Sequence, residues 1–190
     1  MKKVILVASI LFVAVASTAC INNLAVQDLN NKAKVYADKG DYAQAIERLK
    51  SSIDLDPSIF ETHYNLAITY TKAEDYINAV EEYKKVIEMK PDNADPYYSL
   101  GTAENNLAVD IAQGRVRINN IDGSLYSPKN EDDFNKELSD DEKNYIAELY
   151  SAAVENYKKY LELNPNAQDK ADVETQIEKI ISTQNSQTEE

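Results

Sequence analysis

The sequence predicts an all-α fold built from repeated helical hairpins. The stretch Tyr76 to Pro91 nearly repeats the stretch Tyr42 to Pro57, and the two are offset by 34 residues. A constant period of this length indicates one helix-turn-helix unit used several times. The composition agrees, because only 4 of the 190 residues are glycine while alanine, leucine and isoleucine are frequent, which favours helix over strand.

Matching positions in the two stretches show what each hairpin needs. Ala45 and Ala79 are small where two helices must approach closely. Larger side chains at helical spacing fill the seam beside them: Tyr42, Leu49, Tyr76 and Tyr83. Pro57 and Pro91 cannot continue a helix, so each unit ends there.

The two units resemble the tetratricopeptide repeat (TPR). The signature positions are Ala33, Tyr36, Tyr42, Ala45, Leu49 and Pro57 in one unit, and Leu66, Ala67, Tyr70, Tyr76, Ala79, Tyr83 and Pro91 in the next. Leu29 and His63 replace the family's first-helix tryptophan, and we expect His63 to fill the helix seam. The resemblance implies a right-handed superhelical array whose first helices line a concave groove.

The resemblance also predicts the domain organisation. We expect TPR 1 at residues 26–59, TPR 2 at 60–93, TPR 3 at 94–166, a capping helix at 167–183 and a disordered tail at 184–190. A terminal helix is needed because the last repeat would otherwise expose its apolar side. TPR 3 departs from the pattern, since Glu104 stands where Tyr36 and Tyr70 stand in the other repeats.

TPR 3 also carries an insertion. The prolines that end the second and third repeats are 74 residues apart, which is 40 more than the period. We place the insertion at about residues 108–145 and expect part of it to lengthen both helices, the second of which starts at a capping box formed by Ser139 and Glu142. The rest could be a short hairpin around Asp122 and Gly123 or an irregular loop packed on the repeats. We favour the packed loop.

The N-terminal residues 1–19 are typical of a signal peptide. Lys2 and Lys3 precede an apolar run of 13 residues, from Val4 to Ala16, which is shorter than the roughly 20 residues of a membrane-spanning helix. Small residues then lead to Cys20, the only cysteine. A single cysteine cannot form an internal disulfide, so its presence in an exported chain needs another explanation.

That explanation comes from a resemblance to the lipobox of bacterial lipoproteins. It implies that Cys20 is lipidated and that residues 20–25 hold the modified cysteine and a short linker, although Ser17 replaces the family's usual leucine. Ile21 is not the aspartate that signals inner-membrane retention, so the outer membrane is preferred. A soluble periplasmic or secreted product remains the alternative.

Charge and residue types argue against several functions. The net charge is −13, whereas nucleic acids and anionic lipid surfaces require clustered lysine and arginine. One histidine and one cysteine cannot form a zinc site, and Ile118 and Lys129 occupy the acidic positions of a possible calcium loop. We therefore expect neither enzymatic activity nor a cofactor or metal.

The remaining function is protein recognition. The resemblance implies these groove residues: Asn30, Lys34, Asp38, Tyr64, Asn65, Ile68, Lys72, Tyr98, Thr102 and Asn105. A peptide or protein partner is expected there, but not by the family's carboxylate clamp, because Asn65 alone matches and Asp95 replaces a lysine. The alternatives are a self-associating structural protein of the envelope, or a carrier of a small hydrophobic ligand between groove and insertion, near Tyr126 and Phe134.

Overall fold

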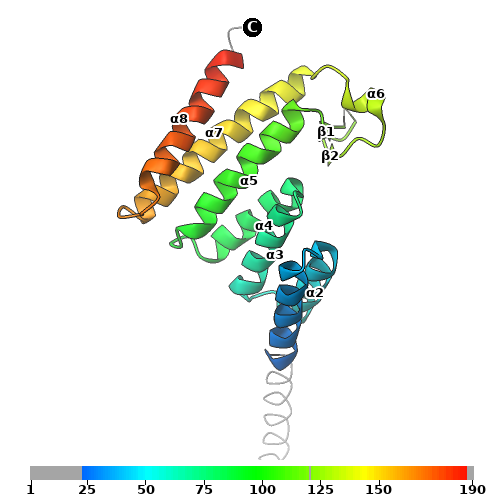
Figure 1. Ribbon diagram of the computed structural model, residues 1–190, viewed down its shortest axis with the longest axis vertical. Coiled ribbons are helices and arrows are strands. Elements are labelled where there is room, and N and C mark those ends of the chain that lie inside the picture. Colours follow the sequence, from blue (N-terminus) through cyan, green and yellow to red (C-terminus); the bar gives the residue numbers. More distant parts are fainter. Residues whose placement is uncertain (1–22, 120, 188–190) are drawn as a thin grey trace, which may run out of the picture. The chain divides into compact units, whose positions relative to one another are not determined.

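The computed structural model describes residues 23–119 and 121–187, so the predicted signal peptide and Cys20 lie outside it. The described chain is a succession of helices (Figure 1), which confirms the all-α fold class. After a helix at residues 23–38, the elements are α2 (Tyr42–Leu55), α3 (Phe60–Lys72), α4 (Tyr76–Met89), α5 (Asp95–Ala112), β1 (Arg117–Ile118), β2 (Leu125–Tyr126), α6 (Glu131–Phe134), α7 (Asp140–Leu163) and α8 (Lys170–Gln187).

The chain divides into an N-terminal part, up to Thr69, and a C-terminal part, from Tyr70. The N-terminal part contains the helix at 23–38, α2 and most of α3. Its core is formed by Val26, Ala33, Ala45, Leu49, Phe60, Leu66 and Ala67. Ala45 is fully buried, with 0% of its surface exposed, as its place in the helix seam predicts.

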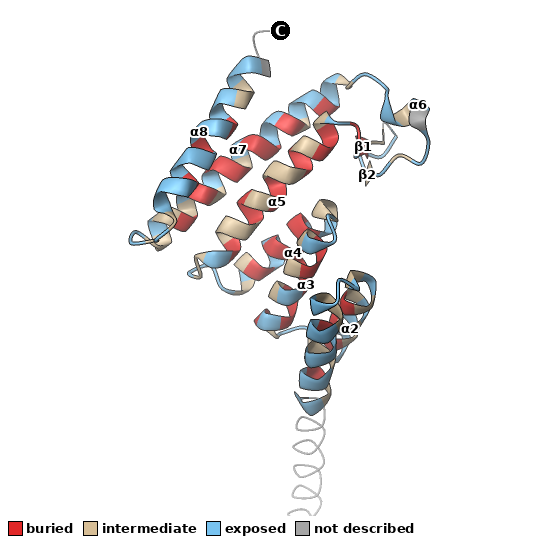
Figure 2. Cartoon of the chain, viewed as in Figure 1, coloured by how far each residue is buried: buried red, intermediate tan, exposed pale blue. Residues whose placement is uncertain are grey.

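In the C-terminal part, α5 packs against both α4 and α7, and α8 packs against α7. Figure 2 shows buried residues along these helices. Ala79 and Ala153 are both 0% exposed, and a Cβ atom added to Gly101 would lie 3.0 Å from the carbonyl oxygen of Ala153. Small residues therefore allow the helices to approach closely, which buries the larger side chains beside them.

The 34-residue period extends to the helix caps. Asp41 and Asp75 are the N-cap residues of α2 and α4, and their side chains accept hydrogen bonds from the backbone N–H groups of Gln44 and Asn78 at 3.2 and 3.3 Å. Each carboxylate therefore satisfies one of the otherwise unpaired donors at a helix start and carries favourable negative charge there.

His63 occupies a repeated position as well. Its Nε2 lies 2.9 Å from the carbonyl oxygen of Pro57, and 34 residues later the Tyr97 hydroxyl donates to the carbonyl of Pro91 at 3.0 Å. A carbonyl can only accept, so His63 donates from Nε2. The side chain is 8% exposed, which confirms that it fills the helix seam, and it also ties the start of α3 to the preceding turn.

The insertion forms the hairpin that we considered the less favoured alternative. β1 and β2 pair antiparallel, with Arg117 opposite Tyr126 and Ile118 opposite Leu125, so the prediction of an irregular loop was wrong. The Asp122 carboxylate accepts from the Ser124 backbone N–H at 3.0 Å, which stabilises the turn locally. Between this hairpin and α7, the described residues contain the four-residue helix α6.

Arg117 fixes the insertion to the start of α7. Its side chain is buried, pairs with Glu142 at 3.3 Å and donates to the carbonyl oxygens of Asp133, Phe134 and Lys136. Ser139 and Glu142 form the predicted capping box. Consequently α7 reaches 24 residues where α4 has 14, and the insertion lengthens the helices as predicted.

The C-terminal helix is longer than predicted. α8 runs through Gln187, so residues 184–187, assigned to a disordered tail, are helical. The Gln184 amide donates to the Ala147 carbonyl and the Ser151 hydroxyl at 3.2 and 3.0 Å. A polar composition therefore did not prevent folding, because this side chain bonds to α7.

A matched pair of turns provides a stability test. Gly40 and Glu74 are one period apart and both have positive φ, at 77° and 59°. A left-handed conformation costs a non-glycine residue roughly 1 kcal/mol. We expect Glu74→Gly to stabilise the chain by about 0.5–1 kcal/mol and Gly40→Ala to destabilise it by a similar amount, both measured by urea unfolding. Equal stability of all three proteins would contradict this account of the turns.

Candidate functional site

A groove lies in the N-terminal part, between the helix at 23–38 and the beginning of α3. Its volume is about 550 Å³. It is lined by Asn23, Val26, Gln27, Asn30, Asn31, Ile59, Glu61, Thr62 and Asn65. Two helices of adjacent predicted repeats thus contribute side chains to one hollow surface.

Carboxamide side chains dominate this groove. Five of the nine lining residues are asparagine or glutamine. Asn23, Gln27, Asn30 and Asn31 recur at spacings of four, three and one, which places them on one face of the helix. A carboxamide both donates and accepts hydrogen bonds, as a peptide group does. The lining therefore matches an extended polypeptide backbone better than it matches an apolar ligand.

Asn30 is held in a defined orientation at the base of this groove. Its Nδ2 lies 3.0 Å from the Val26 carbonyl oxygen and 2.8 and 3.0 Å from the hydroxyl oxygens of Ser52 and Thr62, so its two hydrogens are shared among three acceptors. Because the Val26 carbonyl can only accept, it fixes the nitrogen on that side. The Oδ1 is buried and has no hydrogen-bond partner among residues 23–119 and 121–187, so an acceptor beneath the groove is left unsatisfied.

The predicted groove residues of the N-terminal part fall into two groups. Asn30 and Asn65 both line the groove. Lys34 and Asp38 form an exposed ion pair at 2.8 Å, and Tyr64 stacks on Phe60 with 5.8 Å between ring centroids. Ile68 is half-buried and is not among the lining residues.

The other predicted groove residues belong to the C-terminal part: Lys72, Tyr98, Thr102 and Asn105. Tyr98 contacts the rings of Tyr157 and Tyr160, and the Thr102 hydroxyl lies 3.0 Å from that of Tyr157. Both side chains therefore face α7. Lys72 is exposed and Asn105 half-buried. Their place in a continuous groove stays a prediction.

Sequence reasoning missed some of the lining. Asn23, Gln27 and Asn31 were not selected, nor were Glu61 and Thr62. The signal for the first three was the i, i+4, i+8 recurrence of carboxamides. Thr62 could not be identified as part of the site, because its role depends on the approach of Asn30 from another helix.

Glu104 is an unusual buried group in TPR 3. It is 2% exposed and accepts from the Asn156 amide at 2.8 Å. Burial raises its pKa to about 7, although the bond from Asn156 and the charge of Lys84 act in the opposite direction. Glu104 thus stands where the other repeats have a tyrosine. Because its carboxyl group is buried, the stability of the folded chain depends on pH.

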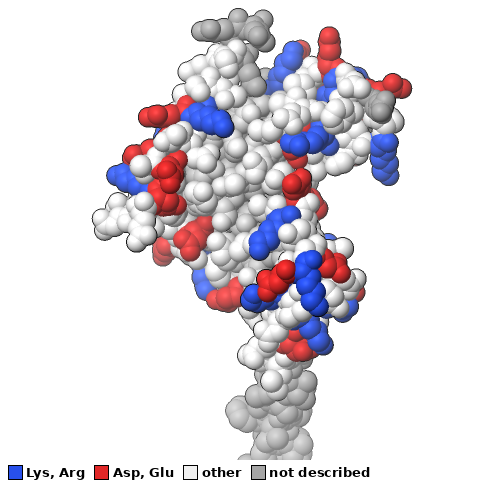
Figure 3. Space-filling view, viewed as in Figure 1, with Lys and Arg blue, Asp and Glu red and all other residues white. Residues whose placement is uncertain are grey.

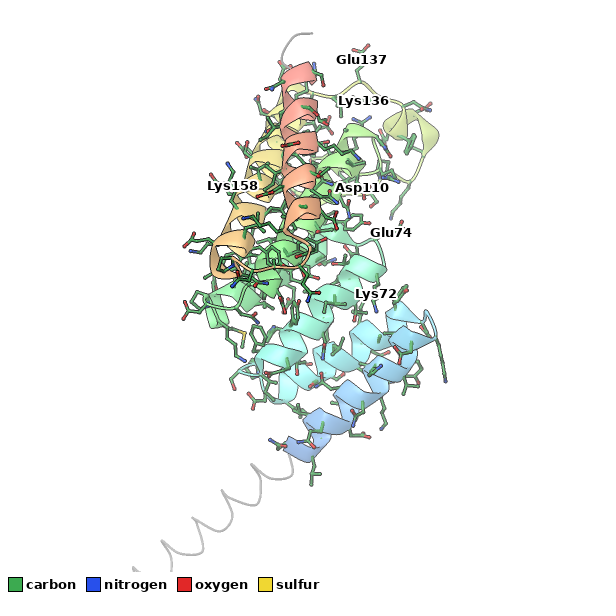
Figure 4. All side chains as sticks on the ribbon, turned by 60° about the vertical axis from the view of Figure 1, so that its left-hand side comes forward. Lys72, Glu74, Asp110, Lys136, Glu137 and Lys158 are labelled. Atoms are coloured by element: carbon green, nitrogen blue, oxygen red, sulfur yellow. The ribbon has the colours of Figure 1, made fainter. Side chains whose placement is uncertain are left out.

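Charged groups also meet near the turn between α3 and α4. Arg115 pairs with Asp110 at 2.6 Å, and burial raises the pKa of Asp110 although Arg115 lowers it. Glu74 adds to that increase, and Figure 4 shows Glu74, Asp110 and Lys72 along the same side of the molecule. The Arg115–Asp110 ion pair lies at the C-terminal end of α5, where the insertion begins.

No group of three or more histidine, cysteine, aspartate or glutamate side chains could hold a metal ion within residues 23–119 and 121–187. None of the helices in the described part of the chain is long and apolar enough to cross a membrane.

The hollow that Tyr126 lines at the insertion also contains Arg117, Asp133 and Glu142, so it is not a deep apolar pocket of the kind a hydrophobic carrier would need.

Comparison with known families identifies the repeats. A sequence model described as TPR repeat matches residues 33–73 and 69–103. The TPR assignment is therefore confirmed for this region. A comparison with curated proteins gives no significant match.

Solved structures with the same fold are also TPR domains. The second TPR domain of human RPAP3, in complex with the HSP70 peptide SGPTIEEVD, is 16% identical, with a TM-score of 0.57 over 84% of this chain and 97% of that chain. The Arabidopsis OM64 TPR domain is 14% identical, with a TM-score of 0.58 over 83% and 98%. The TPR2B domain of yeast Sti1, in a complex with pHsp70, is 17% identical, with a TM-score of 0.53 over 84% and 98%. At these identities the similarity shows the fold, an all-α TPR array.

The raised pKa of Glu104 predicts how stability depends on pH. The carboxyl group ionises near pH 4.5 when unfolded and near 7 when folded, so its contribution is complete below about 4.5 and is lost as pH rises to about 7. The loss is about 3.5 kcal/mol, from a difference of about 2.5 pH units between the two pKa values at 1.4 kcal/mol per unit. We expect Glu104→Gln to remove this slope in urea unfolding between about pH 5 and 8.

Glu178→Gln is the matched control, because Glu178 is exposed on α8. An unchanged slope in the Glu104 variant would show that another group controls the pH dependence.

Proposed function

We propose that this chain is a protein-interaction module that binds an extended segment of a partner in the carboxamide-lined groove, while a lipid on Cys20 tethers it to a membrane of the bacterial cell envelope. The single observation that carries the binding proposal is this groove, with the fixed amide and unsatisfied acceptor of Asn30 at its base. The TPR match supports it. Two similar TPR structures are described as complexes with HSP70 or its peptide.

The groove chemistry favours recognition of the backbone over recognition of a terminal carboxylate. Among the described residues, no lysine or arginine lines the groove, and Glu61 contributes a negative charge. A carboxylate would therefore enter without a cationic partner, which is unfavourable. An internal segment that is uncharged or basic would find both hydrogen-bond donors and acceptors among the carboxamides. A basic segment would also be attracted to a chain of net charge −13.

A random peptide library selected on the full chain tests the binding proposal. The selected peptides should lose at least tenfold in affinity with Asn65→Ala, because this exposed carboxamide lines the groove. Asn166→Ala is the matched control, since Asn166 is exposed and lies in the turn after α7. It should change the affinity less than twofold, as measured by fluorescence anisotropy.

The same peptides are then compared with a free and with an amidated C-terminus. Equal affinities are expected if the groove recognises the backbone. Loss of binding on amidation, or an unchanged affinity for the Asn65 variant, would contradict this mode of recognition.

The tether is supported by the sequence alone. The basic start, the 13-residue apolar run and the small residues before Cys20 are typical of lipoprotein export. Several buried acyl chains would hold the protein on the bilayer, because each methylene contributes ~0.8 kcal/mol. The preferred site is the outer membrane, because Ile21 follows the cysteine.

Mass spectrometry of the chain expressed in a lipoprotein-processing bacterium tests this tether. The mature protein should begin at Cys20 and carry an acylated, thioether-linked glyceride, and Cys20→Ser should move it to the soluble fraction. An unmodified cysteine or cleavage at another residue would remove the anchor from the proposal and leave the groove unaffected.

A further inference from the structure

The insertion hairpin and α7 enclose a second cleft, distinct from the carboxamide-lined groove. Its volume is about 490 Å³. The hairpin contributes Ile118 and Leu125, which are opposite one another in the strand pair, and α7 contributes Asp141, Asn144, Tyr145 and Glu148. Directly opposed residues of two strands lie on the same face, so the hairpin side is apolar.

The helix side of this cleft is acidic. Asp141, Tyr145 and Glu148 recur at spacings of four and three, on one face of α7. Neither the Asp141 nor the Glu148 side chain has a hydrogen bond or ion pair among residues 23–119 and 121–187, and no lysine or arginine in this part of the chain lines the cleft. The neighbouring Lys143 contacts Asp140 instead, at 4.0 Å.

Tyr145 lines the cleft between the acidic side chains of Asp141 and Glu148. Burial raises the pKa of Tyr145, and the charges of Glu104, Glu148 and Glu81 raise it further. These three carboxylates come from α5, α7 and α4. A cation placed against the Tyr145 ring would be attracted by the ring face and by Asp141 and Glu148, which line the same cleft.

The same hairpin presents further apolar surface. Ile121 is 94% exposed and Tyr126 is 41% exposed. Together with Ile118, both line another hollow at the hairpin, next to the cleft that Ile118 and Leu125 line. Figure 3 shows lysine or arginine beside aspartate or glutamate over the insertion, at the upper right. Exposed apolar side chains clustered on one short element are typical of a protein contact surface. A free metal ion or polyamine would leave these side chains uncovered.

We infer that this cleft is a docking site for a protein segment in which a lysine or arginine is flanked by apolar residues. The charged head lies between Asp141 and Glu148, and its aliphatic stem packs on Ile118 and Leu125. The flanking apolar residues cover the hairpin. This site goes beyond the proposed groove and can be occupied independently of it, so one chain can contact a partner at two places.

The probe is the peptide Gly-Leu-Lys-Leu-Gly, with Gly-Leu-Glu-Leu-Gly and Gly-Ser-Lys-Ser-Gly as comparison peptides. The full chain carries ¹³C-labelled isoleucine and leucine methyl groups. The lysine peptide should shift the methyl signals of Ile118 and Leu125. The glutamate peptide should leave them in place, and the serine peptide should bind at least threefold more weakly because it lacks the apolar flanks.

Two charge-matched double variants distinguish binding at this cleft from a general effect of the chain's negative charge. Asp141→Asn with Glu148→Gln should weaken binding of the lysine peptide at least fivefold. Glu88→Gln with Glu178→Gln removes the same charge from exposed positions elsewhere and should change the affinity less than twofold. Asn65→Ala should leave the peptide-induced shifts of the Ile118 and Leu125 methyl signals unchanged, even if it weakens binding of the same peptide in the groove.

Three results would overturn the inference. The first is an absence of methyl shifts at saturating peptide, and the second is equal weakening by both charge-matched double variants. The third is a stronger shift of the same methyl groups by Ca²⁺ or spermidine, which would identify a cation or polyamine site.

Discussion

The close approach of paired helices at small residues is the constraint on which the rest of the structure depends. Ala45, Ala79 and Ala153 are each 0% exposed, and Gly101 leaves no room for a larger side chain beside Ala153. When backbones approach this closely, larger side chains beside them are buried and the remaining helix faces stay polar. The carboxamide-lined groove is one such polar face.

The predicted third repeat shows two ways to bury a carboxylate. Burial alone would raise the pKa of Glu142, but N–H groups of Ser139 and Ile118 and the charge of Arg117 hold it below its usual value. Glu104 has one hydrogen bond from Asn156, and its pKa is raised. The first group stabilises the insertion at neutral pH. The second favours the folded state only when it is protonated.

Local chemistry explains which parts could be predicted. The prolines, the alanines and the N-cap aspartates at Asp41 and Asp75 act within a few residues, so the 34-residue period identified the hairpins and their fold class. The capping box at Ser139 was predictable for the same reason. By contrast, the helical end of α8 depends on Gln184 reaching Ala147, and the docking of the insertion depends on Arg117 reaching Glu142. Such long-range contacts leave no periodic pattern. The groove was predicted in part, through Asn30 and Asn65.

The central claim is that an extended partner segment lies against the carboxamides of the first repeat and the start of the second. A structure of the full chain with a library-selected peptide, determined by crystallography or NMR, tests it most directly. The account predicts an extended peptide in the groove, with backbone hydrogen bonds to the exposed carboxamide of Asn65. A peptide bound elsewhere on the chain, with no contact to Asn65, would contradict it.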